Sequence, residues 1–213
     1  MKRSFGAQVG HYLGGQILFQ LASLPAGGWA LVHGGGSGIG TAAIQLIRAA
    51  GGHVIVTAGS DAKCARCLEL GADAALNYRQ GEFAERVLEL SGGVDVVFDS
   101  IGAPYLAQHL RCLAMGGRLV LIGLMGGARS EINLGLVVAK RLQVIGSTLR
   151  ARPVEEKAAI VRGFLERFGE TLASGGIRPV VDRVLPLEQA QQAHDRVQSS
   201  EHFGKVVLRL PRD

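Results

Sequence analysis

The sequence predicts an α/β protein built on a doubly wound parallel sheet of about six strands. Short apolar segments rich in β-branched residues alternate with stretches of helical periodicity, and glycine fills 31 of the 213 positions. Near-continuous apolar strands are typical of a parallel sheet that helices cover on both faces. The right-handed crossover rule then favours the doubly wound arrangement. Many of the glycines fall where a helix ends and a strand begins, as this fold requires.

The elements follow one another in a regular order. Strands are expected at residues 29–34, 53–58, 74–78, 94–99, 118–124 and 142–148. Helices are expected between them at 39–50, 62–70 and 83–90, and from Pro104 onward, where the first helical turn tolerates proline. An amphipathic stretch at 12–24 predicts a helix that leads into the first strand.

The alternation stops after Pro153. A helical stretch at 154–174, a strand-like run at 180–184, a helix at 187–198 and a final strand at 205–210 follow. This tail holds too little apolar material for a core of its own, so we expect it to pack on the sheet or on a partner. The chain thus divides into a lead-in at 1–28, a sheet domain at 29–175 and a C-terminal segment at 176–213.

Composition and charge exclude several classes. The net charge of +5 favours anionic ligands, but no Lys/Arg tract lies beside an aromatic platform, so nucleic-acid binding is not expected. No run of 18 apolar residues is present, which predicts no membrane span. Three cysteines cannot form a closed disulfide set, and Cys64 and Cys67 read as two positions one turn apart on a helix. We therefore expect a soluble, cytoplasmic protein.

The strongest local pattern is the segment VHGGGSGIGT at 32–41, between the first strand and the first helix. Glycines let a pyrophosphate approach backbone N–H groups, and the N-terminus of the helix adds about half a positive charge there. An ordinary glycine-rich turn remains the alternative. A P-loop is excluded, because a lysine must follow its last glycine and Thr41 stands there.

A short-chain dehydrogenase pattern fits the same loop nearly as well, with His33 in place of threonine. That class needs a Tyr-x-x-x-Lys pair for acid/base chemistry. The residues four positions after Tyr12, Tyr78 and Tyr105 are Gln, Glu and His. The short-chain interpretation therefore lacks its catalytic residues.

What remains resembles the medium-chain dehydrogenase/reductase superfamily, and within it the zinc-free quinone oxidoreductases related to zeta-crystallin. The matching segments follow the family order: LVHGGGSGIGTAAIQL (31–46), VTAGSDAK (56–63), LELGADAALNY (68–78), VDVVFDSIG (94–102), GGRLVLIGLMGG (116–127) and GKVVL (204–208). The resemblance implies a dinucleotide-binding Rossmann domain at 29–175, and relates 176–213 to a GroES-like catalytic domain. Since only 28 residues precede Trp29, most of that GroES-like domain is expected to be missing.

The resemblance also indicates the cofactor. The position where an NAD enzyme carries Asp or Glu to hold the adenosine ribose is Ala58 here. Without that carboxylate a 2′-phosphate is not repelled, and Ser60 and Lys63 can donate hydrogen bonds to it. Tyr78 stands where NADPH-dependent relatives reach the same phosphate, whereas Asp61 argues against NADPH if its carboxylate turns inward. The predicted cofactor is NADPH.

Further cofactor contacts are expected at the carboxyl ends of the strands. On the phosphate side the predicted residues, beside Ser60, Lys63 and Tyr78, are Gly35, Ser37, Gly38, Ile39 and Gly59. Around the nicotinamide, the resemblance implies Ser100, Ile101, Gly123, Leu124, Met125, Thr148, Leu149 and Arg150, with Lys205 from the tail. No metal site is expected, since the histidines and cysteines offer no tetrahedral set with short spacing. No catalytic acid or base is assigned, because a reduced quinone can collect its proton from water.

Two functions stay open. One is an NADPH-dependent oxidoreductase that transfers a hydride to a quinone or a related enone, with activity impaired by the missing half of the cleft. The other is a catalytically silent NADPH-binding module, a truncated gene product or one half of a split enzyme, which the short N-terminal segment favours.

The strand at 142–148 bears on assembly. It contains no proline and no charged residue, and an unpaired apolar edge promotes aggregation unless something covers it. Relatives pair this edge across a two-fold axis, so we expect a homodimer through 142–148. The alternative is that the 154–174 helix or the N-terminal segment covers the edge within one chain.

Overall fold

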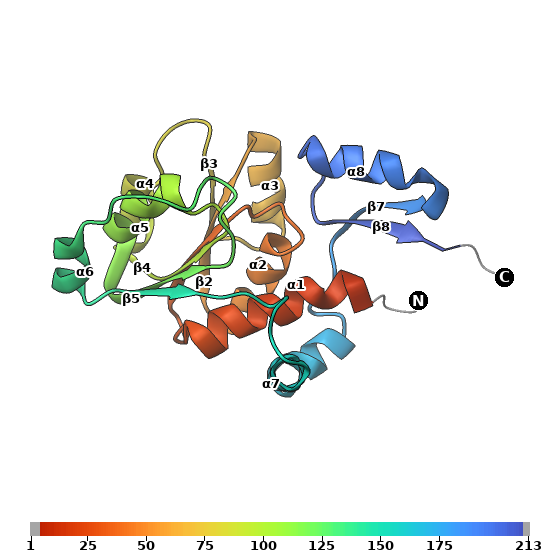
Figure 1. Ribbon diagram of the computed structural model, residues 1–213, viewed down its shortest axis with the longest axis horizontal. Coiled ribbons are helices and arrows are strands. Elements are labelled where there is room, and N and C mark those ends of the chain that lie inside the picture. The colour runs from red at the N-terminus through yellow and green to blue at the C-terminus, as the bar shows by residue number, and fades with distance from the viewer. Residues whose placement is uncertain (1–4, 211–213) are drawn as a thin grey trace.

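The computed structural model describes residues 5–210 and contains two sheets with helices packed around them (Figure 1). Residues 1–4 and 211–213, the outer ends of the predicted lead-in and C-terminal segment, lie outside the described residues. The larger sheet has six parallel strands in the order β3-β2-β1-β4-β5-β6. The strands are β1 (Trp29–His33), β2 (His53–Ala58), β3 (Ala74–Asn77), β4 (Val94–Asp99), β5 (Leu113–Leu121) and β6 (Gln143–Gly146). The predicted doubly wound α/β fold is confirmed.

The first strand, β1, lies in the middle of this sheet, and the later strands are added outward on both of its sides. β1 pairs with β2 in a register that runs from the pair Trp29–His53 to the pair His33–Thr57. On its other side β1 pairs with β4. The strand order therefore changes direction between β1 and β4. In an open parallel sheet, such a switch point opens a crevice at the carboxyl ends of the strands.

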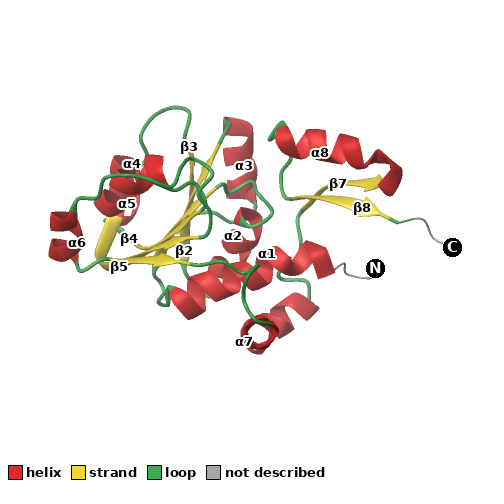
Figure 2. Cartoon of the chain, viewed as in Figure 1, coloured by secondary structure: helices red, strands yellow, loops and turns green. Residues whose placement is uncertain are grey.

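Helices cover both faces of the large sheet (Figure 2). One face packs against α1 (Phe5–Gly15), the π-helical segment η1 (Gln16–Leu21), α2 (Gly40–Ala49) and α3 (Asp61–Glu69). The other packs against α4 (Ala84–Ser91), α5 (Leu106–Cys112), which follows the short helix η2 (Ala103–Tyr105), and α6 (Leu134–Lys140). Successive strand residues alternate between the two cores, so Val32 belongs to the first and Leu31 to the second. α7 (Val154–Ala173) adds an outer layer on α1 and α2.

Besides strand ends that differ from the expected bounds by one to three residues, the large sheet and the helices between its strands differ from the sequence expectations at two places. β5 begins at Leu113, five residues before the predicted start at 118, because Leu113 pairs with Val94 across an irregularity in the ladder. The sequence pattern also misses α6, which has only seven residues, too few to show a helical period. Asn133 caps this helix by accepting a hydrogen bond from the Leu136 N–H at 3.2 Å.

The tail forms a small unit of its own beside the large sheet (Figure 1, blue). It consists of β7 (Val181–Pro186), the short helix η3 (Leu187–Gln189), α8 (Ala190–Gln198) and β8 (Lys205–Arg209), and its two strands pair in parallel. The expectation that the tail packs on the sheet or on a partner stays a prediction, but its strands do not join the six-stranded sheet. Instead Gly204 bridges to Ser37 in the glycine-rich loop, and Phe203 is buried in the first core. The division at 28 and 175 and the GroES-like relation stay predictions.

Two sequence expectations concern the chemistry of the whole chain. Among residues 5–210, no helix is both long enough and apolar enough to cross a membrane. Cys64 and Cys67 lie one turn apart on α3, as predicted, and both are buried free thiols. Burial raises the pKa of Cys67 to about 12, so this sulfur is held as an unreactive thiol.

Candidate functional site

A cleft of about 390 Å³ opens at the carboxyl ends of the strands in the large sheet. Its walls come from the loop after β1, the end of β2, and residues that follow β3, β4 and β5, with two residues from the loop between α8 and β8. This is where an open parallel sheet binds its ligands. The lining residues are Gly34, Gly36, Ser37, Thr57, Ala58, Gly59, Lys63, Tyr78, Ile101, Tyr105, Met125, Gly126, Ser200 and His202.

The glycine-rich loop between β1 and α2 is shaped by close packing. Gly34 has a φ of +71°, a conformation that side-chain-bearing residues rarely adopt. A Cβ on Gly35 would lie 2.8 Å from the side chain of Val56, and a Cβ on Gly40 would lie 2.2 Å from the Gly34 carbonyl oxygen. Ser37 accepts a hydrogen bond from the Gly40 N–H at 2.9 Å and so closes the turn. Gly35 and Gly40 therefore allow close helix–strand packing, and Gly35 does not line the cleft.

Lys205 places a positive charge at the start of α2. Its side chain fills the space in front of Gly38, where a Cβ would lie 2.3 Å from Lys205 Cε. Burial lowers the pKa of the Lys205 ammonium, and no carboxylate within residues 5–210 forms an ion pair with it. The N-terminus of a helix also attracts negative charge. The two features together favour an anionic ligand beside the loop.

The end of β2 carries no carboxylate. Tyr78 follows β3 and reaches this point, since a Cβ on Gly59 would lie 2.6 Å from the Tyr78 hydroxyl. The carboxylate of Asp61 does not line the cleft, because it accepts hydrogen bonds from Asn77 at 2.8 Å and Gln80 at 3.0 Å. The Asp61 carboxylate is therefore not turned into the cleft, the orientation in which it would repel a phosphate.

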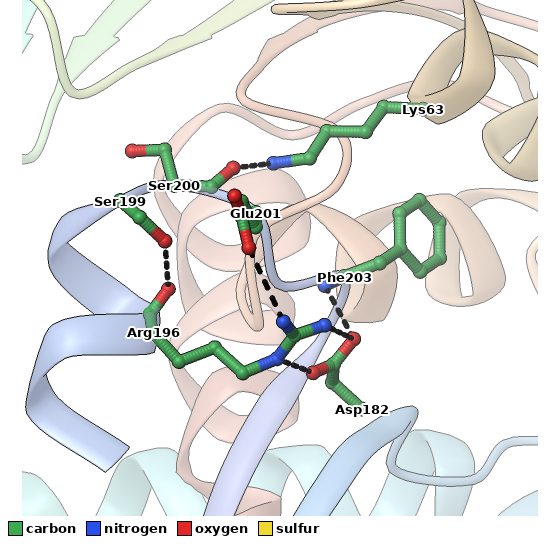
Figure 3. Close-up of polar contacts among 7 residues, drawn as sticks. All are labelled: Lys63, Asp182, Arg196, Ser199, Ser200, Glu201 and Phe203. Atoms are coloured by element: carbon green, nitrogen blue, oxygen red, sulfur yellow. Dashed lines mark hydrogen bonds and ion pairs between the residues drawn. The ribbon is translucent and has the colours of Figure 1, made fainter. Parts of the chain in front are cut away.

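Lys63 is the basic group that lines the cleft beside Tyr78. Its backbone N–H donates to the Ser60 hydroxyl at 3.3 Å, so Ser60 serves as the N-cap of α3. Its ammonium donates to the Ser200 carbonyl oxygen (Figure 3). Burial lowers the pKa of Lys63, and the negative charge of Asp182 partly offsets that effect. The ammonium thus lies at the rim of the cleft with a neutral partner that a charged ligand can displace.

Asp182 anchors the loop that forms this wall (Figure 3). Its carboxylate accepts hydrogen bonds from Arg196 Nε at 2.6 Å and from the Phe203 N–H at 3.1 Å. The Arg196 guanidinium holds the pKa of Asp182 below its usual range. These contacts fix the segment from which Ser200 and His202 reach the cleft.

The predicted site residues separate into three groups. Six line the cleft, namely Ser37, Gly59, Lys63, Tyr78, Ile101 and Met125. Ile39 and Ser100, again with Ser37, line an adjacent cavity of about 40 Å³. The structure places the remaining nine outside both, namely Gly35, Gly38, Ser60, Gly123, Leu124, Thr148, Leu149, Arg150 and Lys205.

Sequence reasoning missed several lining residues. Gly34, Gly36, Thr57 and Gly126 are direct neighbours of residues that the motifs had already singled out, and Tyr105 follows the helix-starting Pro104. Extending each motif by one residue on either side would have included these positions. Ser200 and His202 carry no local signal, because only the packing of the tail brings them to the cleft.

A buried polar cluster lies under the cleft floor, on the side of α4 and α5. His33 Nε2 is 2.8 Å from His109 Nε2, and His33 Nδ1 is 2.9 Å from the Thr57 hydroxyl. Asp99 also belongs to this cluster, which spacing did not reveal because its members come from β1, α5 and β4. Burial lowers the pKa of His109 to about 3 and that of His33 well below its usual value, so both rings are neutral.

Comparison with known proteins identifies the family. Residues 38–163 match the family model described as zinc-binding dehydrogenase. The chain belongs to this family. Quinone oxidoreductase of Rattus norvegicus is 33% identical over 213 residues, which cover 96% of this chain and 62% of the relative. The resemblance to quinone oxidoreductases that the motifs predict is therefore confirmed.

Solved structures agree with this assignment. The structure of Escherichia coli quinone oxidoreductase complexed with NADPH superposes with a TM-score of 0.80 at 29% identity, and covers 94% of this chain and 62% of that one. An NAD-dependent alcohol dehydrogenase gives a TM-score of 0.82 at 32% identity, with 95% and 57% covered. The chain thus spans less than two thirds of the length of these relatives.

Proposed function

We propose that this chain binds NADPH in the cleft and works as an NADPH-dependent oxidoreductase that transfers a hydride to a quinone or a related enone. The observation that carries the proposal is the end of β2, where Ala58 replaces an acid and both Lys63 and Tyr78 line the cleft. A relative whose structure contains NADPH has the same fold. When bound, NADPH supplies the hydride.

The residues of this chain would bind and orient the cofactor. The loop at 34–38, the N-terminus of α2 and the unpaired Lys205 suit the pyrophosphate. Lys63 would exchange its hydrogen bond with the Ser200 carbonyl for one to the 2′-phosphate, which is the stronger, charge-assisted contact. Tyr78 would donate a hydrogen bond from its hydroxyl to the same phosphate.

The substrate side of the proposal asks little of the protein. A quinone needs alignment with the nicotinamide ring, and its oxygen can take a proton from water or a nearby hydroxyl, so the proposal assigns neither a zinc ion nor a catalytic acid to this step. Ile101 and Met125, which line the cleft, would lie on this side of it. Met125 is 77% exposed and its neighbour Leu124 is 50% exposed, so this side is more open to water.

That openness supports a second candidate, a module that binds NADPH without catalysis. Titrations of NADPH and NADH followed by nicotinamide fluorescence, and then turnover with a simple ortho-quinone, separate the candidates. Preferential NADPH binding with turnover supports the oxidoreductase, and preferential binding without turnover supports the silent module. Equal binding of NADPH and NADH would contradict both.

We also propose a homodimer through β6. This strand is the last of the large sheet and pairs with β5 on one side. Val144 in its middle is 43% exposed, which leaves an apolar edge available for pairing. A cytoplasmic location and the absence of nucleic-acid partners stay predictions of the sequence.

A further inference from the structure

We propose that His33, His109 and Asp99 form a binding site for a divalent cation, with zinc the best-fitting ion, directly beneath the cleft. Each residue offers one ligand atom, and the three atoms all lie within 4.8 Å of one another. The proposal concerns a part of the fold that the hydride-transfer chemistry does not use. It stands whether or not the chain binds NADPH.

The two imidazoles are arranged as ligands. Their Nε2 atoms face each other at 2.8 Å. Zinc–nitrogen bonds of about 2.0–2.1 Å in a tetrahedral site put two nitrogens roughly 3.3 Å apart, so the rings must separate by about 0.5 Å and tilt toward the ion to admit it. The Thr57 hydroxyl can accept a hydrogen bond from His33 Nδ1, which leaves His33 Nε2 with a free lone pair. Such an outer partner is typical of metal-bound histidines.

His109 has a nitrogen that the protein does not use. Its Nδ1 is buried and has no hydrogen-bond partner among the described residues. Without metal, one proton lies between the two Nε2 atoms. When zinc takes that position, this proton moves within its own ring. If it is on His109 Nε2 it can move to His109 Nδ1, and if it is on His33 Nε2 it can move to His33 Nδ1. Either ring stays neutral and offers its Nε2 lone pair to the ion.

Asp99 supplies the negative charge. Its side chain is fully buried, and its two oxygens accept hydrogen bonds from the backbone N–H groups of Ile101 and Gly102, both at 2.8 Å. No cationic side chain pairs with this carboxylate among residues 5–210. A buried carboxylate without a counter-charge is costly, and a divalent ion beside it would offset that cost.

Aromatic rings flank the cluster, and the cleft lies next to it. Phe83 and Tyr105 pack their rings against His33 with centroids 4.9 Å away. Tyr105 and Thr57 also line the cleft, so the cluster is separated from that space by a single layer of side chains. Two nitrogens and one oxygen, with a water as fourth ligand, favour zinc over magnesium or calcium, which prefer oxygen ligands.

Cobalt serves as the test probe, because tetrahedral Co²⁺ has a strong visible absorption and takes zinc sites. The chain is freed of metal with a chelator, titrated with Co²⁺, and then titrated with Zn²⁺ to displace it. The expected result is one Co²⁺ per chain with tetrahedral absorption. His33→Asn and His109→Asn should each weaken binding more than roughly 100-fold, since loss of an outer partner alone costs 10–100-fold. Thr57→Val, which removes that outer partner, should fall within the 10–100-fold range.

Two control variants remove other histidines. His53→Gln removes the surface hydrogen bond with Asp73, and His194→Gln changes an exposed side chain on α8, so both should bind Co²⁺ as the wild type does. A second measurement needs no variant: Zn²⁺ should shift the imidazole ¹⁵N resonances of His33 and His109. The proposal is overturned if the folded wild type binds no stoichiometric Co²⁺, if either ligand variant retains full affinity, or if His53→Gln loses the binding.

Discussion

The two halves of the sheet's carboxyl edge are built differently. Around the ends of β1, β2 and β3, contacts with the loop between α8 and β8 hold the residues in place. Lys63 donates a hydrogen bond to the Ser200 carbonyl oxygen, and Gly204 bridges to Ser37. After the end of β5 and along β6 apolar side chains face solvent, with Met125 at 77% and Val144 at 43% exposure. The first half, the closed half, is a pocket whose walls this chain completes, whereas the second, the open half, presents the kind of apolar surface that binds another molecule.

The difference predicts where a single methyl group is tolerated. In the closed half, Gly40→Ala would place a Cβ 2.2 Å from the Gly34 carbonyl oxygen and 2.7 Å from Gly35 Cα, both of them backbone atoms. We expect a loss of about 3 kcal/mol or more in unfolding free energy, the upper end for overpacking. The matched control is Gly146→Ala in β6, where a Cβ meets nothing within 4 Å and the change should stay within about 0.5 kcal/mol. Urea unfolding of both variants measures the contrast, and equal losses would contradict it.

Gly38→Val sharpens the same comparison. The atoms in its way belong to the flexible end of Lys205 rather than to backbone, so the variant should fold. Displacement of the ammonium from the start of α2 should nevertheless abolish NADPH binding, which fluorescence titration detects. A folded Gly38→Val variant that retained NADPH affinity would show that this part of the loop is only a structural turn.

The stability of the closed half should also depend on pH through His11 on α1. Burial, helped by the charge of Lys205, lowers the pKa of His11 to about 4. Between the unfolded pKa near 6.5 and about 4, the unfolded chain binds a proton that the folded chain does not, so stability falls as the pH falls. One such group contributes about 1.4 kcal/mol per pH unit, or roughly 3 kcal/mol over this range.

His11→Leu tests this. The variant should lose less unfolding free energy than the wild type between pH 7 and pH 4, measured by urea unfolding at both values. It should be no less stable at pH 7, because the two His11 ring nitrogens have no hydrogen-bond partners among the described residues. His194→Gln, on the exposed face of α8, should keep the wild-type slope. A His11→Leu slope equal to that of the wild type would contradict the assignment.

Lys63→Met tests the ligand of the closed half. A charge-assisted hydrogen bond contributes about 1.5–3 kcal/mol, so NADPH affinity should fall roughly tenfold or more, with NADH affinity nearly unchanged. Lys157→Met is the matched control, because the Lys157 ammonium also donates to a backbone carbonyl, that of Arg150, but lies outside the cleft. Equal losses for NADPH and NADH, or an equal effect of Lys157→Met, would remove the assignment to the 2′-phosphate.

Local patterns predicted the closed half well, because its strands and the glycine loop are contiguous in the sequence. The bounds of β2 and β4 agree with the prediction to the residue. Contacts made by packing between distant segments were not predictable in this way. The space in front of Gly38 is filled by Lys205, and His33 meets His109 and Asp99 only because β1, α5 and β4 fold together. Conversely, Thr148 ends a predicted strand and Arg150 follows it, yet neither lines the cleft.

The open half is tested at its edge strand. Val144 lies in the middle of β6, and a lysine there would place a charge within any sheet that continues across two chains. The wild type should have about twice the chain mass in light scattering, and Val144→Lys should have the mass of one chain. Val197→Lys, at a position on α8 with a similar exposure of 46%, should leave the dimer intact. If the wild type already has the mass of one chain at every concentration, the β6 edge is not a dimer interface, and the apolar surface of this half must serve another molecule.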